Sequence, residues 1–548
     1  MKLMKIDKIK IVNFKCYYGD FIVSFNNDLN IIVGNNEAGK STILEAIHLA
    51  LTGFLNGRNI QNELTQYLFN KQIVSEYIDS IKSRNPIQPP IVLIEVFFSG
   101  DDEEIALYRG DGNSLKEDAS GIAFKILFDE KYREAYKLFI DKGEIISLPL
   151  EYYGVSWSTF ARKDITPRNI DIKSTLIDSS NYRYQNGSDV YVSKIIKDNL
   201  NPDDIVNISQ AHRRMREGFM QEEAVKCINN KINNDIKLTD KEITLSVELT
   251  TKNAWESNLV TELDEIPFHF VGKGTQCIAK TELALSTNRA RNAGIILIEE
   301  PENHLSHSNL NQFISCIKES FGDKQIIMTT HSSFVANKLG LDKLILIDNF
   351  KPVKFNDLKS DTKRFFQKIS GYDTLRFVLS NKVILVEGDS DELVVQKAYL
   401  VNNNGKLPIE NGIDIISVGL SFLRFLELAE KLKKDTTVIT DNDGDIDALK
   451  RKYAEYINEN TKSYIRIVYD PVIDVGEDSS FNYNTLEPKM LKENGLDKFN
   501  VIFNKSFNTN EEMLKYMKLN KTDCALAIFE TESEIQFPNY ILEGIKNE

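Results

Sequence analysis

The stretch GNNEAGKS at residues 34–41 places the strongest constraint on how this chain folds. It matches the phosphate-loop pattern G-x-x-x-x-G-K-[ST] in full, and it lies between an apolar run, LNIIV, and a helix-favouring run, TILEAIHLAL. In such a loop, backbone amides face phosphate oxygens, Lys40 adds a positive charge and Ser41 supplies a hydroxyl to Mg²⁺. The sequence therefore predicts a strand–loop–helix unit that binds ATP. The predicted contacts are Gly34, Asn35, Asn36, Gly39, Lys40, Ser41 and Thr42.

A second part of an ATPase site follows far along the chain. The segment GIILIEEPENHLSH (294–307) is an apolar strand that ends in Glu299 and Glu300. In this class of ATPase the first acid holds Mg²⁺, usually through water, and the second polarises the attacking water. We assign these roles to Glu299 and Glu300 respectively. The next apolar strand, QIIMTTHSS (325–333), ends in His331, which can contact the γ-phosphate.

The segment VGKGTQ (271–276) opens a predicted helix, whose amides suit a γ-phosphate offered from a second subunit. Gly272, Gly274 and Gln276 are therefore further predicted nucleotide contacts. Together these motifs resemble the ABC-type ATPases of the DNA-repair and chromosome-maintenance kind, and the opening IKIVNFKCYYGDFIVSF resembles their N-terminal strands. The resemblance implies that two heads sandwich ATP, and hence a homodimer. Lys273 departs from it, because a serine is common at that position.

Between the two ATPase parts lies a long insert that is mostly helix-forming over residues 188–232. We predict a helical dimerisation element there; the alternative is a helical subdomain packed on its own head. The predicted domains are 1–165 and 256–350 for the two parts of the ATPase head, 166–255 for the insert, 351–378 for a charged connector, and 379–548 for a second α/β domain.

In the C-terminal half, two apolar strands end in clusters of acids. They are NKVILVEGDSDE at 381–392 and TTVITDNDGD at 436–445, with a third apolar run, GIDIISVG, between them. The acids are Glu387, Asp389, Asp391 and Glu392 after the first strand and Asp441, Asp443 and Asp445 after the second. Strands that alternate with helices predict a mainly parallel sheet, in which sites lie beyond the carboxyl ends of the strands. Both clusters should therefore meet at one edge.

Several carboxylates at one edge repel one another unless a cation joins them. Ligands that are all oxygen, without a nearby cysteine or histidine, favour Mg²⁺ or Mn²⁺ over zinc. Two such ions about 4 Å apart can promote phosphodiester cleavage. A Ca²⁺-stabilised loop, or helix capping by Asp389 and Ser390, is the structural alternative.

The pattern E-G followed by D-x-D on successive strand ends resembles the Toprim domain of topoisomerases, primases and certain nucleases. Two later segments, NTLEP (484–488) and NKTDCALAI (520–528), narrow the resemblance to the OLD (overcoming lysogenization defect) family of nucleases. It implies that Lys521 stabilises the cleavage transition state or leaving group. Asp391 stands where the family often has a second acidic ligand, and Glu392 is the alternative for that role. Asp445 could be a ligand or could lie behind the ligands. The implied metal ligands are Glu387, Asp391, Asp441, Asp443 and Glu487, with Ser41 and Glu299 at the ATP site.

The resemblance implies an ATP-regulated, divalent-metal-dependent DNA endonuclease that nicks or cuts both strands, similar to the Gabija and retron-associated antiphage nucleases. Its cofactors would be ATP and Mg²⁺ or Mn²⁺, and its partners double-stranded DNA and a second copy of the chain. Higher oligomers, a defence-system partner protein and a retron nucleic acid stay open. The alternatives are a topoisomerase-like Toprim enzyme and a non-catalytic ATP switch in DNA repair. The predicted catalytic residues are Glu387, Asp441, Asp443, Glu487, Lys521 and, for ATP hydrolysis, Glu300.

Charge and composition set limits on these interpretations. The net charge of −14 argues against a generic nucleic-acid coat, so DNA binding requires local basic patches. Candidates are RRMR (213–216), KLKK (431–434) and KRK (450–452), which could also be solvated helix faces. No run approaches the roughly 18 apolar residues of a membrane helix. Five scattered cysteines without a C-x-x-C pair, and no secretory signal, predict a cytoplasmic protein.

Overall fold

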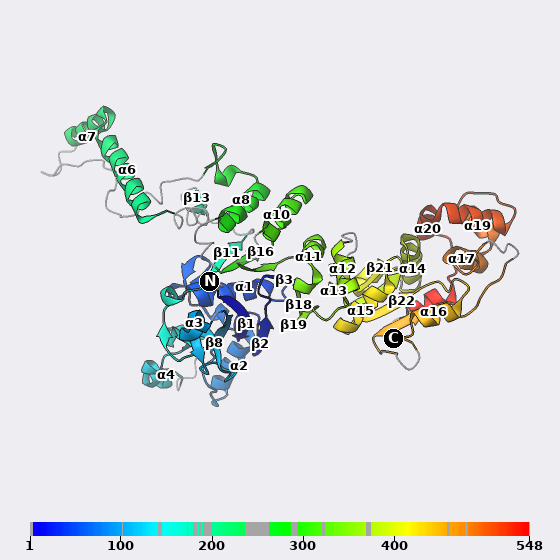
Figure 1. Ribbon diagram of the computed structural model, residues 1–548, viewed down its shortest axis with the longest axis horizontal. Helices are drawn as coiled ribbons and strands as arrows, with labels where there is room; N and C mark the ends of the chain where they lie inside the picture. The colour runs from blue at the N-terminus through cyan, green and yellow to red at the C-terminus, as the bar shows by residue number, and fades with distance from the viewer. Residues whose placement is uncertain are drawn as a thin grey trace. The chain divides into compact units, whose positions relative to one another are not determined.

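The structure, a computed structural model, consists of two compact units (Figure 1). Unit 1 comprises Met1–His331 and Lys343–Pro352, and unit 2 comprises Ser332–Asp342 and Val353–Glu548. The residues described are 4–100, 102–140, 145–172, 174–178, 184–185, 188–189, 200–235, 262–286, 294–303, 305–319, 324–368, 374–457, 461–476 and 481–546.

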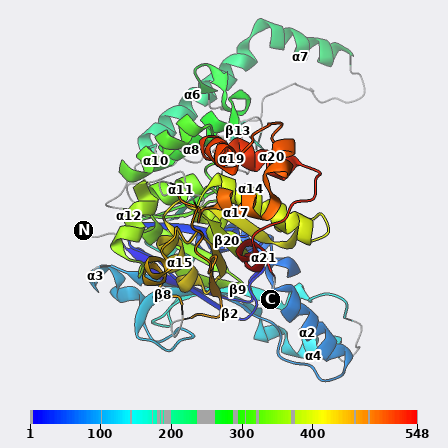
Figure 2. The same ribbon diagram turned by 90° about the vertical axis from the view of Figure 1, so that its right-hand side faces the viewer.

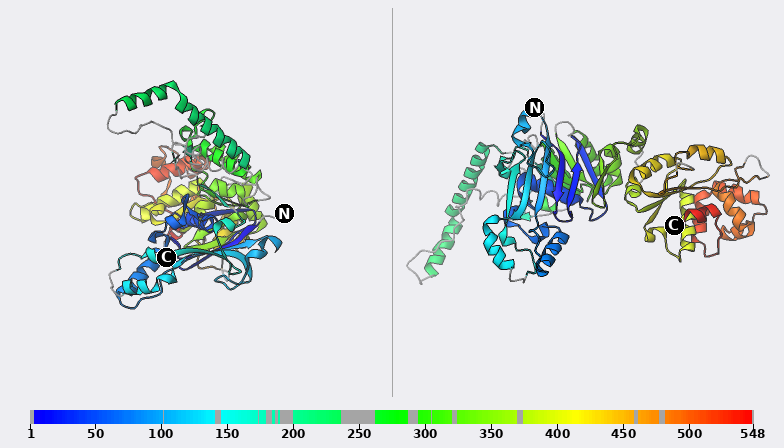
Figure 3. Two further views of the ribbon diagram at one scale, coloured as in Figure 1. Left: turned by 90° about the vertical axis from the view of Figure 1, so that its left-hand side faces the viewer. Right: turned by 90° about the horizontal axis from the view of Figure 1, so that it is seen from below.

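Unit 1 contains two large sheets, whose strands can be followed as arrows in the right-hand view of Figure 3. The first has the strand order β11-β16-β17-β3-β18-β19, and its neighbours from β11 to β18 run parallel. Its strands are β3 (Leu29–Gly34), β11 (Ser174–Asp178), β16 (Ile295–Glu299), β17 (Gln325–Thr329), β18 (Leu344–Asp348) and β19 (Lys351–Lys354). Apolar β-branched residues fill β3, β16 and β17, as expected for strands buried on both faces.

The second sheet of unit 1 is antiparallel, with the order β10-β9-β8-β6-β1-β2 and β7 paired to β8. Its strands are β1 (Lys5–Val12), β2 (Asp20–Ser24), β6 (Val92–Ser99), β7 (Arg109–Gly110), β8 (Ala119–Phe128), β9 (Tyr153–Thr159) and β10 (Asp164–Ile165). One hydrophobic core joins both sheets to α1 (Lys40–Thr52), which contributes Ile43, Leu44 and Ile47. The phosphate-binding loop is thus held between a buried strand and a buried helix.

Further helices of unit 1 are α2 (Lys71–Lys82), α3 (Asp102–Ile105), α4 (Arg133–Ile140), α8 (Lys273–Ser286) and α10 (His307–Glu319). The predicted insert contains two consecutive helices, α6 (Pro202–Gln221) and α7 (Glu223–Asp235). It does not begin at residue 166, because β11 at Ser174–Asp178 pairs with β16 inside the parallel sheet. The remainder of the insert, including 236–255, lies outside the described residues.

Unit 2 contains a four-stranded parallel sheet with the order β21-β20-β22-β23, of which Figure 2 labels β20. The strands are β20 (Lys382–Val386), β21 (Ile413–Ser417), β22 (Asp435–Ile439) and β23 (Ile465–Val468). The helices after β20 and β21 are α14 (Asp389–Asn402) and α15 (Phe422–Leu432). The others are α16 (Ile446–Lys452), α17 (Leu486–Asn494), α18 (Leu496–Ile502), α19 (Asn510–Leu519), α20 (Lys521–Glu530) and α21 (Asn539–Gly544). The predicted parallel α/β fold is confirmed.

The segment predicted as a charged connector, 351–378, contains regular secondary structure. It contains β19, which extends the sheet of unit 1, and the helices α12 (Ser360–Lys368) and α13 (Thr374–Leu379) of unit 2. The preceding helix α11 (Ser333–Leu339) also belongs to unit 2. On α12 the charged residues Asp361, Arg364 and Lys368 are exposed, whereas Phe366 on α12 and Phe377 on α13 are buried.

Candidate nucleotide and metal sites

The predicted nucleotide contacts of unit 1 gather at one edge of its parallel sheet. β3, β17 and β16 are neighbours, and Thr329 pairs with Ile32 on one side and Glu299 on the other. The loop after β3, Glu299 at the end of β16 and His331 after β17 therefore lie beyond the same strand ends. This is the edge at which open parallel sheets bind ligands.

The phosphate-binding loop is already closed around its lysine. Gly39, with a φ of 91°, precedes the first residue of α1 in a conformation that favours glycine. Lys40 Nζ donates hydrogen bonds to the carbonyl oxygens of Gly34 at 2.9 Å and Asn35 at 3.0 Å. Burial lowers the pKa of Lys40, and the negative charge of Glu300 opposes this shift. The lysine is thus held inside the loop, where a phosphate would supply further negative charge.

The side chain of Glu300 is held between two partners. Its Oε1 lies 3.1 Å from His331 Nε2, and its Oε2 accepts a hydrogen bond from Asn303 Nδ2 at 2.9 Å. Its backbone takes a φ of 40°, and its N–H donates to the Thr329 carbonyl at 3.2 Å. These contacts bring Glu300 and His331 together and hold the Glu300 carboxylate in place.

Glu302 is a residue that the motif reading did not single out. Its Oε1 accepts hydrogen bonds from Thr330 Oγ1 at 2.8 Å and from the His331 N–H at 2.6 Å. Glu302 therefore ties the segment after β16 to the segment after β17. The signal available in the sequence for Glu302 was its position in EEPEN, three residues after the first acid.

The segment VGKGTQ (271–276), predicted to contact the nucleotide, has both exposed and buried residues in the structure. Gly272 and Lys273 are exposed at the start of α8, where they are accessible to a partner. Gly274 is half-buried in the first turn. Gln276 is only 2% exposed, and its Nε2 donates to the carbonyls of Phe268 and Val271, both at 2.8 Å. Gln276 thus holds the turn before α8, and its predicted contact with nucleotide would require these bonds to open.

The acids of unit 2 lie where the topology predicts a site. The chain passes from β20 to β21 on one side and then to β22 on the other, so the ends of β20 and β22 form the topological switch point of the sheet. Glu387 follows β20 directly, and Asp441 lies two residues after the end of β22. We call these strand ends, with the acids around them, the acid edge.

The charges at the acid edge act on one another. Burial and the charges of Asp391 and Glu387 raise the pKa of Asp441 well above its ordinary value. Burial raises the pKa of Asp391 to about 6, and the charge of Glu387 adds to this shift. The pKa of Glu387 is raised by partial burial and by the charge of Asp443, although its side chain also faces solvent. The edge is therefore short of positive charge, which a divalent cation would supply.

Asp391 and Glu392 have different partners in the structure. Asp391 Oδ2 accepts a hydrogen bond from the Gly388 N–H at 3.0 Å, which places its carboxylate at the turn after β20. Glu392 instead lies 3.9 Å from the Arg376 guanidinium and accepts a hydrogen bond from Gln396 at 3.2 Å. Asp391 rather than Glu392 therefore shares the acid edge.

Glu487 and Lys521 form an ion pair. Glu487 lies in the first turn of α17 with 9% of its side chain exposed, and its Oε1 is 2.9 Å from Lys521 Nζ at the start of α20. Burial favours the neutral amine, but the hydrogen bond to Glu487 and the charge of Asp391 outweigh it and raise the pKa of Lys521. The NTLEP and NKTD segments, which are distant in sequence, thus meet at the acid edge.

The remaining acids of the two clusters are exposed, and two of them accept hydrogen bonds. Asp443, with a φ of 50°, is exposed and accepts a hydrogen bond from Asn482 Nδ2 at 3.1 Å. Asp445 caps α16 by accepting a hydrogen bond from the Ala448 N–H at 2.8 Å, which favours a capping role over metal ligation. Asp389 is exposed in the first turn of α14. The two clusters therefore contain both ligand candidates and helix caps.

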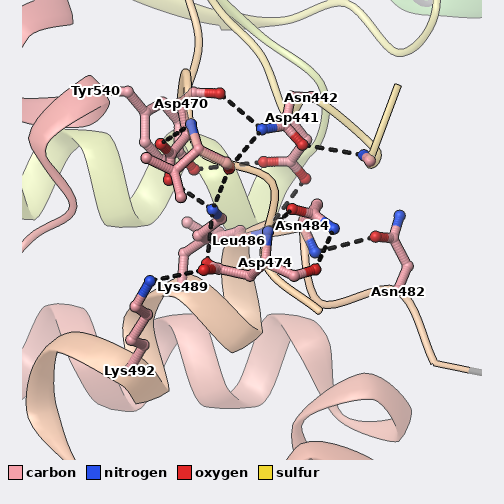
Figure 4. A network of polar contacts seen from close by, with 12 residues as sticks. Asp441, Asn442, Asp470, Asp474, Asn482, Asn484, Leu486, Lys489, Lys492 and Tyr540 are labelled. Atoms are coloured by element: carbon pink, nitrogen blue, oxygen red, sulfur yellow. Dashed lines mark hydrogen bonds and ion pairs between the residues drawn. The ribbon is translucent and has the colours of Figure 1, made fainter. Parts of the chain in front are cut away.

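A buried network behind the acid edge was missed by the sequence analysis (Figure 4). Lys489, 3% exposed, places Nζ at 2.6 Å from Asp470 and 2.8 Å from Asp474. Asn442 donates to the Asp470 carbonyl at 2.6 Å, and Asn484 to the Asp474 carbonyl at 2.9 Å. The loop after β23 thus joins the D-x-D segment to the start of α17. Lys489 lies on a buried turn of α17, and a buried lysine requires a partner of opposite charge. This requirement was the available signal for the network.

The donor set fits a hard divalent cation. All candidate ligands at the acid edge are carboxylate oxygens, which Mg²⁺ and Mn²⁺ prefer. Within the described residues, no three acidic, histidine or cysteine side chains already surround a common centre. Glu487 faces Lys521 and Asp391 faces Gly388, so these side chains would turn to share an ion.

Comparisons with known proteins match both units. An AAA domain family matches residues 8–266, and the family described as overcoming lysogenization defect protein-like, TOPRIM domain, matches residues 378–443. Among the described residues, no helix has the length and apolar character needed to cross a membrane.

The chain is similar in sequence to two named proteins, and one solved structure aligns with it. The retron Vc95 probable ATPase of Vibrio cholerae is 21% identical over 447 residues, which are 72% of this chain and 82% of that protein. The DNA double-strand break repair Rad50 ATPase of Thermoplasma acidophilum is 35% identical over 74 residues, 14% of this chain and 8% of that protein. The structure of an SmcHead bound to the C-winged helix domain of ScpA aligns with a TM-score of 0.34 and 16% identity, over 63% of this chain and 96% of that one. The two family models thus match an AAA domain over residues 8–266 and a TOPRIM domain of the overcoming lysogenization defect protein-like kind over residues 378–443.

Proposed function

We propose that this protein is an ATP-regulated, divalent-metal-dependent DNA endonuclease that acts in antiphage defence. The observation that carries the proposal is the acid edge: Glu387 and Asp441 follow the neighbouring strands β20 and β22, and the cationic Lys521 lies 2.9 Å from Glu487. Burial and neighbouring carboxylates raise the pKa of Glu387, Asp391 and Asp441 there. Bound Mg²⁺ or Mn²⁺ would activate a nucleophile and stabilise the leaving oxygen. The similarity to a retron ATPase supports the defence role.

The chain's own residues have distinct proposed roles in cleavage. Glu387, Asp391, Asp441, Asp443 and Glu487 would hold the cation. Lys521 is exposed over 52% of its side chain, so it can leave Glu487 and pair with a phosphate oxygen as negative charge develops. A raised pKa keeps this lysine protonated at neutral pH. The pair with Glu487 holds the lysine at the edge before DNA arrives.

A basic run beside the acid edge suits the DNA backbone. Lys450, Arg451 and Lys452 end α16 with exposed side chains, and the charge of Lys452 acts on Glu387. The KLKK run is used otherwise, since Lys431 pairs with Asp357 and Lys434 donates to the Ser380 carbonyl. We therefore place the DNA strand along α16, where phosphate contacts would offset the overall negative charge of the protein.

ATP would control this activity through paired heads. The contacts of Lys40 with its loop and of Glu300 with His331 support ATP binding and hydrolysis. The exposed Gly272 and Lys273 at the start of α8 support a nucleotide contact from a second copy of the chain. The helices α6 and α7 are proposed to add to this dimer.

Supercoiled plasmid incubated with Mg²⁺ or Mn²⁺, with and without ATP, tests the proposal. Nicked or linear DNA that requires the metal is expected. Closed, relaxed plasmid would instead favour a topoisomerase-like enzyme, and unchanged plasmid under all conditions would favour a non-catalytic ATP switch.

A further inference from the structure

Tyr540 reaches the acid edge from a helix that no motif covers. It lies on α21 near the end of the chain, is 4% exposed, and its hydroxyl donates to Asp441 Oδ1 at 3.3 Å. The other carboxylate oxygen, Oδ2, accepts a hydrogen bond from the Leu486 N–H at 3.2 Å. Figure 4 shows both partners converging on Asp441. Each oxygen of this carboxylate thus has a donor, and each keeps lone-pair capacity for a cation.

The backbone of α21 is fixed against the sheet that carries Asp441. A Cβ added at Gly544 would come within 2.4 Å of the Ile439 side chain, so the helix packs closely against the last residue of β22. Arg466 on β23 donates to the carbonyls of Glu543, Gly544 and Lys546 at 3.1, 3.1 and 3.3 Å. These contacts set the position of Tyr540 independently of the loops around the acid edge.

We propose that Tyr540 is a positioning residue that orients the Asp441 carboxylate for the divalent cation. The inference rests on the proposed metal-dependent function. A buried phenol hydroxyl can donate one hydrogen bond, and a donor to an ionised carboxylate fixes its rotation and stabilises its charge. The 3.3 Å distance is long for a hydroxyl donor, and a small turn of the Asp441 carboxylate would bring the bond into the usual range. Partners behind metal ligands commonly change metal affinity by 10- to 100-fold.

The substitution Tyr540→Phe removes this hydroxyl and keeps the buried ring. Tyr399→Phe is the matched control, because Tyr399 is 0% exposed in the same hydrophobic core and its hydroxyl accepts a hydrogen bond from Asn411 at 2.9 Å. Both variants lose one buried hydroxyl, but only the first loses a partner of Asp441.

The test measures Mn²⁺ binding to nucleotide-free, full-length protein by the electron paramagnetic resonance signal of free Mn²⁺. Asp441→Asn identifies the binding that depends on the acid edge. We expect the Kd of that site to rise about 10-fold in Tyr540→Phe and to stay unchanged in Tyr399→Phe. Plasmid cleavage by Tyr540→Phe should then be slow at limiting Mn²⁺ and recover at saturating Mn²⁺.

Wild-type affinity in Tyr540→Phe, or an equal loss in both variants, would overturn the positioning role while the proposed function stands. Loss of cleavage that saturating Mn²⁺ does not restore would also overturn it. If the wild-type protein shows no Mn²⁺ binding that Asp441→Asn removes, the proposed function itself fails, and the role of Tyr540 falls with it.

Discussion

The substitution Asp391→Asn measures how much one buried carboxylate charge at the acid edge costs the folded protein. Asp391 accepts a hydrogen bond from the Gly388 N–H at 3.0 Å, and an asparagine side-chain oxygen can accept the same bond. The substitution therefore removes a charge that acts on Asp441 while it keeps the cap of α14.

The magnitude follows from the pKa of Asp391, which burial raises from its ordinary value of 3.8 to about 6. The folded protein thus binds this proton more tightly than the unfolded chain does. The free energy of unfolding therefore falls as the pH rises from about 4 to about 6. Above that range the loss has reached its full value. The difference between the two pKa values corresponds to about 3 kcal/mol. For a domain of this size, removing the deficit raises Tm by roughly 6–12 °C.

Calorimetry of the metal-free, full-length protein tests this value. At pH 7.5 the unit 2 transition of Asp391→Asn should lie above that of the wild type, and the difference should shrink as the pH falls to 5. Asp389→Asn is the control, since Asp389 is exposed on the same helical turn. A variant that melts at or below the wild type at pH 7.5 would refute the charge argument.

Asp391→Asn and Glu392→Gln together test which of these two acids binds the cation. Saturating Mn²⁺, at about 100 times its Kd, should stabilise the wild-type protein by about 2.7 kcal/mol. Asp391→Asn should lose much of this gain, and Glu392→Gln should keep it, because Glu392 faces Arg376. The opposite pattern would make Glu392 the ligand.

Two further predictions concern the two catalytic centres. Glu300→Gln should bind ATP normally but hydrolyse it about 100-fold more slowly, because it removes the base that His331 and Asn303 orient; normal turnover in a phosphate-release assay would contradict this assignment. Lys521→Met should lower plasmid cleavage about 100-fold without weakening Mn²⁺ binding, since it removes a positive charge from the transition state and frees Glu487, with partial recovery in Lys521→Arg. Weaker Mn²⁺ binding in Lys521→Met would instead indicate that the lysine only organises the ligands.

Much of the fold could be predicted because its signals are local. The apolar runs before Gly34, Glu299, Glu387 and Asp441 are each long enough to define a buried strand, and their alternation with helices predicts parallel sheets. Once the strands are parallel, acids at their carboxyl ends meet at one edge, as Glu387 and Asp441 do. The strand β11 escaped prediction because its five residues, STLID, carry no long apolar run, and its partner β16 lies far along the chain.

The parts of the site that could not be predicted depend on tertiary contacts. Tyr540 contacts Asp441 across 99 residues, and nothing in the sequence NYILEG indicates such a partner. Asp391 and Glu392 are adjacent acids, and only the direction in which each side chain leaves α14 separates them. Gln276 belongs to a recognisable motif, yet its amide bonds to the preceding turn. In each case the residue type was visible, but its partner was set by packing.

Plasmid cleavage by variants of the acid edge tests the central claim most directly. Supercoiled plasmid is incubated with Mn²⁺ and either the wild-type protein, Glu387→Ala, or the double variant Asp441→Ala with Asp443→Ala, and ATP binding is measured on the same preparations. We predict that the wild type nicks or linearises the plasmid, and that both acid variants bind ATP but leave the plasmid intact. Cleavage that persists in these variants would contradict the account and place the nuclease centre elsewhere.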